Sequence, residues 1–185
     1  PTTLRVGLGA ENDLRITDFS EGPEGWSFKL AWRGTEVGAI NWNLPGEYNA
    51  RNAAMAALSS ALALVPNLDN PFAVSGLPSF GNCRGVKRRQ EILVEQEGLV
   101  VLSDFAHHPT AISGALVSLR ARWPEHRIIA CFEPRSNTAV TNVFQDEFTE
   151  ALANADEVLI GAIHRAERFA PEERLDAQSM IQRFR

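Results

Sequence analysis

The first 45 residues alternate short apolar runs with turn signals. Three runs rich in aromatic and β-branched residues cover residues 14–19, 26–32 and 36–42. The segments between them, GPEG at residues 22–25 and RGT at residues 33–35, carry the glycines that tight turns between strands require. This pattern predicts a three-stranded antiparallel meander.

A helical period replaces the alternation after residue 46. Residues 47–65 are rich in Ala and Leu, their apolar positions are three and four apart, and Pro66 follows the run. We expect one long helix here. Asn70 followed by Pro71 is typical of a helix start and predicts a second, short helix, with a loop over residues 78–84 after it.

The second half of the chain has a different rhythm. Apolar runs begin at residues 99 (LVVLS), 127 (RIIACF) and 157 (EVLIGAI), and helix-like stretches at residues 111–122 and 143–154 separate them. Continuous apolar strands that alternate with helices are typical of a parallel sheet built from right-handed βαβ units. The sequence therefore predicts an α/β protein, in which an antiparallel subsheet with helices precedes a Rossmann-like parallel domain.

The change of rhythm places a domain boundary inside the chain. A length of 185 residues is enough for one domain or two small ones, and we expect two, over residues 1–86 and 87–185. Residues 91–95 are expected to add a strand to the second. Three parallel strands are fewer than the roughly five or six of a doubly wound sheet, and the chain begins with Pro1 rather than Met. We therefore expect the second domain to be incomplete and the chain to be a fragment.

Charge and cysteine content disfavour several classes of partner. Acidic residues outnumber basic ones by 23 to 18, which gives a net charge of −5 and no general basic surface for nucleic acid or an anionic membrane. Cys83 and Cys131 lie far apart in sequence and indicate neither a disulfide framework nor structural zinc. With no long apolar run and no signal-like start, we expect a cytoplasmic location.

Polar side chains follow each of the three predicted parallel strands, at the edge where ligands bind in open parallel sheets. Asp104, His107 and His108 come after the first strand, EPRSNT at residues 133–138 after the second, and HR at residues 164–165 after the third. A carboxylate, arginines and imidazoles that titrate near neutral pH make this edge a candidate binding site.

Three interpretations of Asp104, His107 and His108 are open. Asp104 can cap the following helix while one histidine is a buried hydrogen-bonding partner. The three side chains can instead bind a phosphate or carboxylate at the helix start. They can also hold a metal ion in a hydrolase, although no further ligands stand at useful spacing.

Two further segments suggest nucleotide recognition. GVKRRQE at residues 85–91 is the only basic cluster of the sequence, and it is either a solvated linker or, through its adjacent arginines, a phosphate clamp. Asn49 and Asn52 stand three apart at the start of the predicted long helix and so share one face. Each carboxamide either caps the helix or matches the donor and acceptor edge of adenine.

Taken in order, these segments resemble the motifs of the Mur ligase family, ATP-dependent enzymes that build the peptide of the bacterial cell-wall precursor. LPGEYNARNAA at residues 44–54 resembles the family's G-x-H-N-x-x-N-x-x-A-A helix, with Tyr in the place of its His. Residues 85–91 resemble its G-x-x-R-R-x-E junction, and residues 104–110 its D-[YF]-A-H-H-P-T segment. CFEPRSNT at residues 131–138 resembles the E-P-R-S-N-T of the branch that adds a ready-made tripeptide. The branch that adds L-alanine has a Q-P-H-R-Y-like segment instead.

The resemblance implies roles for individual residues. Asn49 and Asn52 would contact adenine, Arg89 the phosphates, and Asp104 the ribose or the metal–phosphate region. Arg89, Asp104 and His107 would form the catalytic set. The residues expected on the substrate side are His107, His108, Arg135 and Asn137.

The resemblance also implies an activity for the intact enzyme. ATP and Mg²⁺ would serve as cofactors, the carboxylate of UDP-N-acetylmuramate would become an acyl phosphate, and the amine of the tripeptide L-Ala-γ-D-Glu-meso-diaminopimelate would displace phosphate. Residues 1–86 would be the C-terminal part of the central ATP-binding domain and residues 87–185 part of the C-terminal domain.

Two elements of the family have no counterpart in the sequence. They are the phosphate loop, G-x-x-G-K-[ST], and the carboxylate that holds Mg²⁺. No metal ligand is therefore assigned, and the isolated chain is expected to be inactive. An L-alanine ligase and a non-catalytic nucleotide-binding module are the alternatives.

Overall fold

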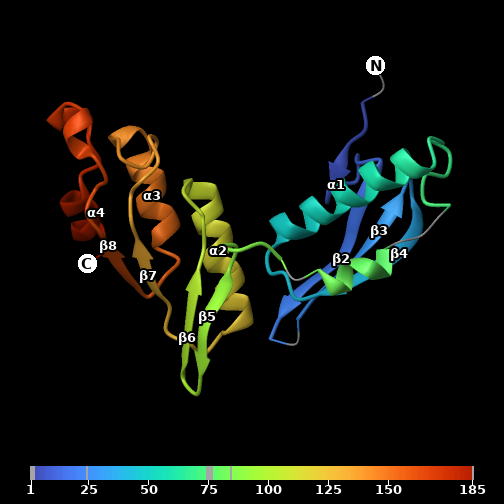
Figure 1. Ribbon diagram of the computed structural model, residues 1–185, viewed down its shortest axis with the longest axis horizontal. Coiled ribbons are helices and arrows are strands. Elements are labelled where there is room, and N and C mark those ends of the chain that lie inside the picture. The colour runs from blue at the N-terminus through green and yellow to red at the C-terminus, as the bar shows by residue number, and fades with distance from the viewer. Residues whose placement is uncertain (1–2, 24, 74–76, 84, 185) are drawn as a thin grey trace. The chain divides into compact units, whose positions relative to one another are not determined.

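The computed structural model describes residues 3–23, 25–73, 77–83 and 85–184 (Figure 1). The chain divides into two compact units, Pro1–Gly85 and Val86–Arg185, which we call unit 1 and unit 2. Over the described residues, no helix combines the length and the apolar composition needed to span a bilayer.

Unit 1 is built on an antiparallel sheet. Its strands are β1 (Val6–Gly7), β2 (Leu14–Gly22), β3 (Gly25–Trp32) and β4 (Thr35–Trp42), in the order β1-β2-β3-β4. β2, β3 and β4 form the predicted meander, and β1 adds a short parallel pair with β2. Every second residue of β3 is buried, from Trp26 to Trp32, because alternate side chains of a strand share a face.

The helix α1 (Glu47–Leu64) packs against this buried face. Small side chains let a helix lie close to the large aromatic side chains of a sheet, which fills the core without voids. The buried residues of α1 are nearly all alanines: Ala50, Ala53, Ala54, Ala57, Leu58 and Ala61.

A glycine and a glutamate fix the start of α1. Gly46 has a φ of 93°, in the left-handed region that glycine tolerates, and a Cβ at this position would stand 2.4 Å from the Tyr48 ring. Glu21 Oε1 accepts a hydrogen bond from the Gly46 N–H at 3.0 Å and from the Trp26 indole N–H at 2.6 Å. The first turn of α1 therefore has a defined position on the sheet.

The segment after α1 differs from the prediction. Residues 71–73 form a turn and a bend rather than the start of a short helix, and the next three residues lie outside the described part of the chain. A 3-10 helix, η1 (Leu77–Asn82), occupies most of the predicted loop. The Phe72 and Trp32 ring centroids are 6.3 Å apart, and Leu77 is only 3% exposed. The path of this segment is therefore determined by two separate contacts with the sheet and not by apolar residues repeated at helical spacing.

Unit 2 contains two separate two-stranded sheets. β5 (Glu91–Gln96) and β6 (Leu99–Ser103) form an antiparallel hairpin, while β7 (Ile129–Phe132) and β8 (Glu157–Ile160) are parallel neighbours. The helices are α2 (Pro109–Arg122), α3 (Gln145–Leu152) and α4 (Ala177–Arg183), with 3-10 turns η2 (Asn142–Phe144), η3 (Ala166–Arg168) and η4 (Pro171–Glu173).

The strand pairing of unit 2 corrects one prediction. β7 and β8 pair as predicted, and the strand expected at residues 91–95 is present. However, β6 pairs with β5 and, within residues 86–184, not with β7. The two-residue turn Glu97-Gly98, with Gly98 at a φ of 76°, closes the hairpin locally, whereas the whole of α2 separates β6 from β7 in sequence. Residues of α2, α3 and β7 share one core, including Leu116, Phe148 and Phe132.

Candidate functional site

The two asparagines of unit 1 lie in the first turns of α1. Asn49 is half-buried, and its Nδ2 donates a hydrogen bond to the Pro45 carbonyl at 2.6 Å. That bond turns Nδ2 towards the loop before the helix and Oδ1 away from it. Asn52 lies one turn later and is exposed. The pair therefore presents an oriented acceptor and an exposed carboxamide on one side of the helix.

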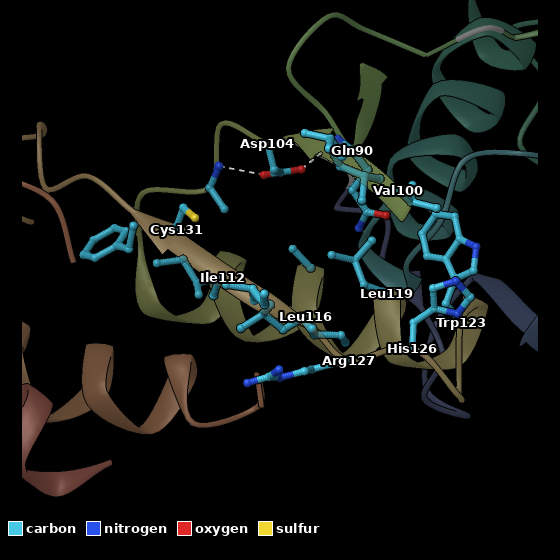
Figure 2. Close-up of a pocket in the computed structure, with 18 of the residues that line it drawn as sticks. Gln90, Val100, Asp104, Ile112, Leu116, Leu119, Trp123, His126, Arg127 and Cys131 are labelled. Atoms are coloured by element: carbon cyan, nitrogen blue, oxygen red, sulfur yellow. Dashed lines mark hydrogen bonds between the residues drawn. The ribbon is translucent and has the colours of Figure 1, made fainter. Parts of the chain in front are cut away.

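In unit 2, Asp104 joins the basic segment to the end of β6. Its Oδ2 accepts the Gln90 N–H at 2.8 Å and its Oδ1 accepts the Ala106 N–H at 2.7 Å (Figure 2). Arg88 and Gln90 have φ values of 59° and 47°, which non-glycine residues adopt only when their surroundings impose it. The carboxylate thus holds the two arginines in a defined loop.

Phe105 is the residue around which the predicted catalytic set gathers. The Arg89 Cζ lies 5.4 Å from the Phe105 ring centroid, and the His107 ring centroid lies 5.0 Å from it. The His107 Nδ1 is also 2.9 Å from the Phe105 carbonyl oxygen. Phe105 is half exposed, so the guanidinium is oriented by cation–π attraction while remaining accessible.

The structure therefore brings together Arg89, Asp104 and His107, the three residues expected to form the catalytic set. The contribution of Phe105 was missed in the sequence. An aromatic residue between the strand-end carboxylate and two histidines was the available signal, because an aromatic ring is an effective partner for arginine.

The remaining candidates contact other residues. His108 occupies the N-cap position of α2, and its ring centroid is 5.3 Å from that of Phe144. Arg135 follows β7 and pairs with Glu133 at 3.5 Å, with both side chains mostly exposed. Asn137 is exposed in the turn after Arg135. These residues follow the carboxyl ends of β6 and β7, two strands whose arrows point the same way in Figure 1.

No metal centre is present in the described part of either unit: no three or more His, Cys, Asp and Glu residues there are grouped so that they could hold an ion. The arrangement of unit 2 can instead bind an anion through Arg89 and adjacent backbone groups. Asp104 and Gln90 also lie at one end of an apolar cavity between β6 and β7 (Figure 2).

A family model described as "Mur ligase, glutamate ligase domain" matches residues 88–184. The chain is 41% identical over 170 residues to the UDP-N-acetylmuramate--L-alanyl-gamma-D-glutamyl-meso-2,6-diaminoheptandioate ligase of Escherichia coli K12, covering 85% of the chain and 35% of that protein. It is 34% identical over 165 residues to a UDP-N-acetylmuramate--L-alanine ligase of Pelobacter propionicus, covering 88% and 34%.

Solved structures share the fold. The UDP-N-acetylmuramate-alanine ligase of Thermotoga maritima superposes with a TM-score of 0.70 at 20% identity, covering 89% of the chain and 35% of that protein. The murein peptide ligase of Psychrobacter arcticus gives 0.58 at 23% identity, covering 97% and 35%. A folylpolyglutamate synthase of Mycobacterium tuberculosis, complexed with ADP, gives 0.60 at 20% identity, covering 93% and 35%. The chain spans about a third of the length of these relatives.

Proposed function

The chain belongs to the Mur ligase family, and on that premise we propose that it is part of an ATP-dependent ligase that joins L-Ala-γ-D-Glu-meso-diaminopimelate to UDP-N-acetylmuramate. One observation carries the choice of substrate. Identity is 41% to the E. coli tripeptide ligase and 29–34% to the L-alanine ligases of several other bacteria. The EPRSNT segment at residues 133–138 supports the same branch.

We assign residues 1–86 to the end of the central ATP-binding domain and residues 87–185 to part of the C-terminal domain. The geometry of α1 suits a nucleotide base. With Nδ2 of Asn49 held by Pro45, its Oδ1 is left to accept from the adenine amino group, and the exposed Asn52 carboxamide can bind the same edge. A solved relative of this fold is complexed with ADP. The described residues include no group of three or more His, Cys, Asp and Glu that could hold an ion, and we assign no Mg²⁺ ligand to this chain.

The contacts of the residues in unit 2 support the roles that we assign to them. Arg89, oriented over Phe105, supplies a fixed positive charge for the phosphates, and a preorganised charge stabilises a transition state without reorganisation cost. Asp104 positions Arg89 by holding the Gln90 N–H. His107, beside the same ring, and His108, Arg135 and Asn137, beyond the strand ends, are assigned to the amine substrate. ATP, when bound, supplies the phosphoryl group that activates the muramate carboxylate.

A chimera tests the proposal. The matched third of the E. coli ligase is replaced by this chain, and kcat/KM for amide formation is measured with the tripeptide and with L-alanine. We expect a preference for the tripeptide of at least about tenfold, which corresponds to about 1.4 kcal/mol. Equal or reversed preference would overturn the choice of substrate.

Arg135→Lys in the same chimera should raise KM for the tripeptide because a planar two-pronged contact is lost, while Arg51→Lys, a change on the exposed face of α1, serves as the control.

The L-alanine ligase is the second candidate. Several curated relatives carry that activity, at 29–34% identity. The same kcat/KM comparison decides between the two, because only the amine differs.

A further inference from the structure

One buried peptide group at the start of α1 joins two side chains of unit 1. The N–H of the Pro45–Gly46 peptide donates to Glu21 Oε1 at 3.0 Å, and its C=O accepts from Asn49 Nδ2 at 2.6 Å. Pro45 and Gly46 are both buried. A buried peptide group needs a partner at each end, and here a side chain stands at each. The orientation of this peptide therefore links Glu21 to Asn49.

A β-bulge directs Glu21 towards this peptide. Ile16 is buried on the core face of β2, and the register with β3 then shifts between Thr17 and Ser20. Beyond the shift, Glu21 lies opposite the buried Trp26 and shares its face of the sheet. Strict alternation from Ile16 would turn position 21 to the opposite face. The bulge therefore re-aims this carboxylate towards the side of the sheet that α1 covers.

The Glu21 carboxylate accommodates only one orientation of the peptide. An ionised carboxylate has acceptors and no donor. The N–H and C=O of a trans peptide point in opposite directions, and no peptide bond in the described part of the chain is cis. Turning the peptide over would therefore place the Pro45 carbonyl against the carboxylate. The Trp26 indole N–H, which donates to the same Oε1 at 2.6 Å, keeps the carboxylate in place.

The other groups at this position do not choose between the two orientations. Gly46 has a φ of 93°, and turning the preceding peptide over changes this angle by about 180°, to a negative value that glycine adopts equally well. The Asn49 carboxamide both donates and accepts, so it can pair with either end of the peptide. The choice of orientation therefore depends on Glu21.

The peptide in turn sets which end of the Asn49 carboxamide is left for a ligand. A carbonyl can only accept, so the Pro45 oxygen takes the NH₂ group and Oδ1 is directed away from it. In the other orientation, the Gly46 N–H would take Oδ1 as its acceptor and leave the NH₂ group for a ligand. An available oxygen matches the 6-amino group of adenine, whereas an available NH₂ group matches the 6-carbonyl of a 6-oxopurine such as guanine.

We propose that Glu21 is a positioning residue for nucleotide selection: by fixing the Pro45–Gly46 peptide it keeps Asn49 an acceptor, and the ligase therefore prefers a 6-aminopurine to a 6-oxopurine triphosphate. The inference rests on the proposed function, in which Asn49 contacts the base. Glu21 acts through the peptide and through Asn49, and needs no contact with the nucleotide. A site that accepts an N–H group discriminates against an analogue that lacks it, because the acceptor is then left unpaired.

Purine selectivity of the chimera with the E. coli ligase tests the proposal. The values of kcat and KM are measured with ATP and with ITP, in which a carbonyl replaces the 6-amino group. The chimera should prefer ATP by at least about tenfold in kcat/KM. Glu21→Leu should lower this preference at least about fivefold by raising KM for ATP, with kcat nearly unchanged, because the change does not touch the groups that bind the phosphates.

Three further variants separate positioning from stability. Glu21→Gln keeps an oxygen that can accept both N–H groups and should retain most of the preference for ATP. Glu36→Gln alters an exposed carboxylate that pairs with Lys29 and is the control, with the preference unchanged. Glu21→Asp withdraws the carboxylate from Gly46 by about 1.5 Å, one carbon–carbon bond. It should lower the preference too, and it replaces Glu21→Leu if that variant does not fold.

Asn49→Ala distinguishes this inference from the function on which it rests. The variant should lower the preference for ATP as Glu21→Leu does, because the acceptor itself is removed. If Asn49→Ala lowers the preference and the Glu21 variants leave it unchanged, the role of Glu21 is overturned while the contact between Asn49 and the base stands. If neither change lowers it, the contact between Asn49 and the base is overturned, and the role of Glu21 with it.

Hydrogen exchange in the isolated chain, followed by NMR, gives a readout that needs no nucleotide. The Asn49 Nδ2 protons should exchange at least about tenfold faster in Glu21→Leu than in Glu21→Gln, because the peptide is no longer held. The backbone amides of β3, which lies between β2 and β4, should stay protected in both variants. Equal protection of the Asn49 Nδ2 protons in the two variants would contradict the proposal.

Discussion

The two units of the chain cover their sheets to different extents. In the strands of unit 1, no large apolar side chain among the described residues is exposed, because α1 packs over the face that carries the tryptophans. In unit 2, exposed apolar side chains stand on every strand: Leu93 and Val94, Leu99 and Val101, Ile129, and Leu159. The meander of unit 1 is built from neighbouring segments, whereas a parallel sheet depends on partners that are distant in sequence. A short stretch of chain can complete the first kind of sheet and not the second.

The largest expected effect compares two leucines on strands. Leu30→Ala in β3 removes a side chain that is 0% exposed and should destabilise unit 1 by about 2–5 kcal/mol, because it leaves a cavity. The matched change Leu159→Ala in β8, where the side chain is 59% exposed, should cost less than about 0.5 kcal/mol. Denaturant unfolding followed by tryptophan fluorescence and circular dichroism measures both. Equal losses would remove the contrast between the units.

A second change examines how unit 1 positions α1. Gly46→Ala combines a left-handed φ with a Cβ 2.4 Å from the Tyr48 ring and should destabilise unit 1 by about 1–3 kcal/mol. Gly34→Ala is the control, because its φ is 89° but nothing lies within 4 Å of the new Cβ. The difference between the two free energies of unfolding isolates the contact with Tyr48. If Gly46→Ala lowered the free energy of unfolding no more than Gly34→Ala does, the contact with Tyr48 would not contribute to the destabilisation.

A third change tests the loop that holds Arg89 in unit 2. Asp104→Asn replaces one of two carboxylate acceptors by an NH₂ group and should cost about 1 kcal/mol, because one backbone N–H loses its partner. Faster hydrogen exchange of the Gln90 amide would identify the loop as the affected part. Glu133→Gln, which alters only an exposed pair with Arg135 at 3.5 Å, should leave that exchange unchanged.

The smallest expected effect is a pH dependence at the other end of the parallel pair. The backbone N–H of Ile128, followed by the Arg120 guanidinium, lowers the pKa of Asp156 below its usual value. A carboxyl group with a lowered pKa stabilises the fold above the pKa of the unfolded chain, and this contribution is lost as the pH falls through the folded value. Unit 2 should therefore lose stability below about pH 4. Unfolding experiments at a series of pH values check this. In the Asp156→Asn variant, the free energy of unfolding should depend less on pH below about pH 4. An unchanged dependence would assign the loss of stability to other groups.

Much of the fold follows from local sequence patterns. Alternation predicted β2, β3 and β4, helical spacing predicted α1, and the parallel pairing of β7 with β8 followed from the βαβ rhythm. The structure confirms these elements. The segment around Phe72 and Leu77 could not be predicted, because two contacts with the sheet override its local signals. The pairing of β6 with β5 was missed for the opposite reason: a two-residue turn acts locally, and the prediction relied on a distant partner.

The sequence predicted which residues form the candidate site better than it predicted the contacts between them. Strand ends and a basic cluster indicated the segments that contain Arg89, Asp104 and His107, the family resemblance singled out these three residues, and they lie close together in unit 2. Two contacts could not be predicted: the hydrogen bond from the Gln90 N–H to Asp104, and the contacts of the Phe105 ring with Arg89 and His107. They depend on the positive φ values of Arg88 and Gln90, which the residue types at these positions do not predict. The functional roles of these residues, and of Asn49 and Asn52, stay predictions.

The alanine face of α1 has a consequence for protein engineering. Ala50, Ala53 and Ala54 are almost fully buried, whereas Asn52 between them is exposed. The tight packing around the three alanines leaves no room for a larger side chain, whereas a larger side chain at position 52 displaces only solvent. A saturation library at position 52 should therefore leave the thermal stability of unit 1 nearly unchanged, because the buried alanine face and position 52 lie on different sides of one helix.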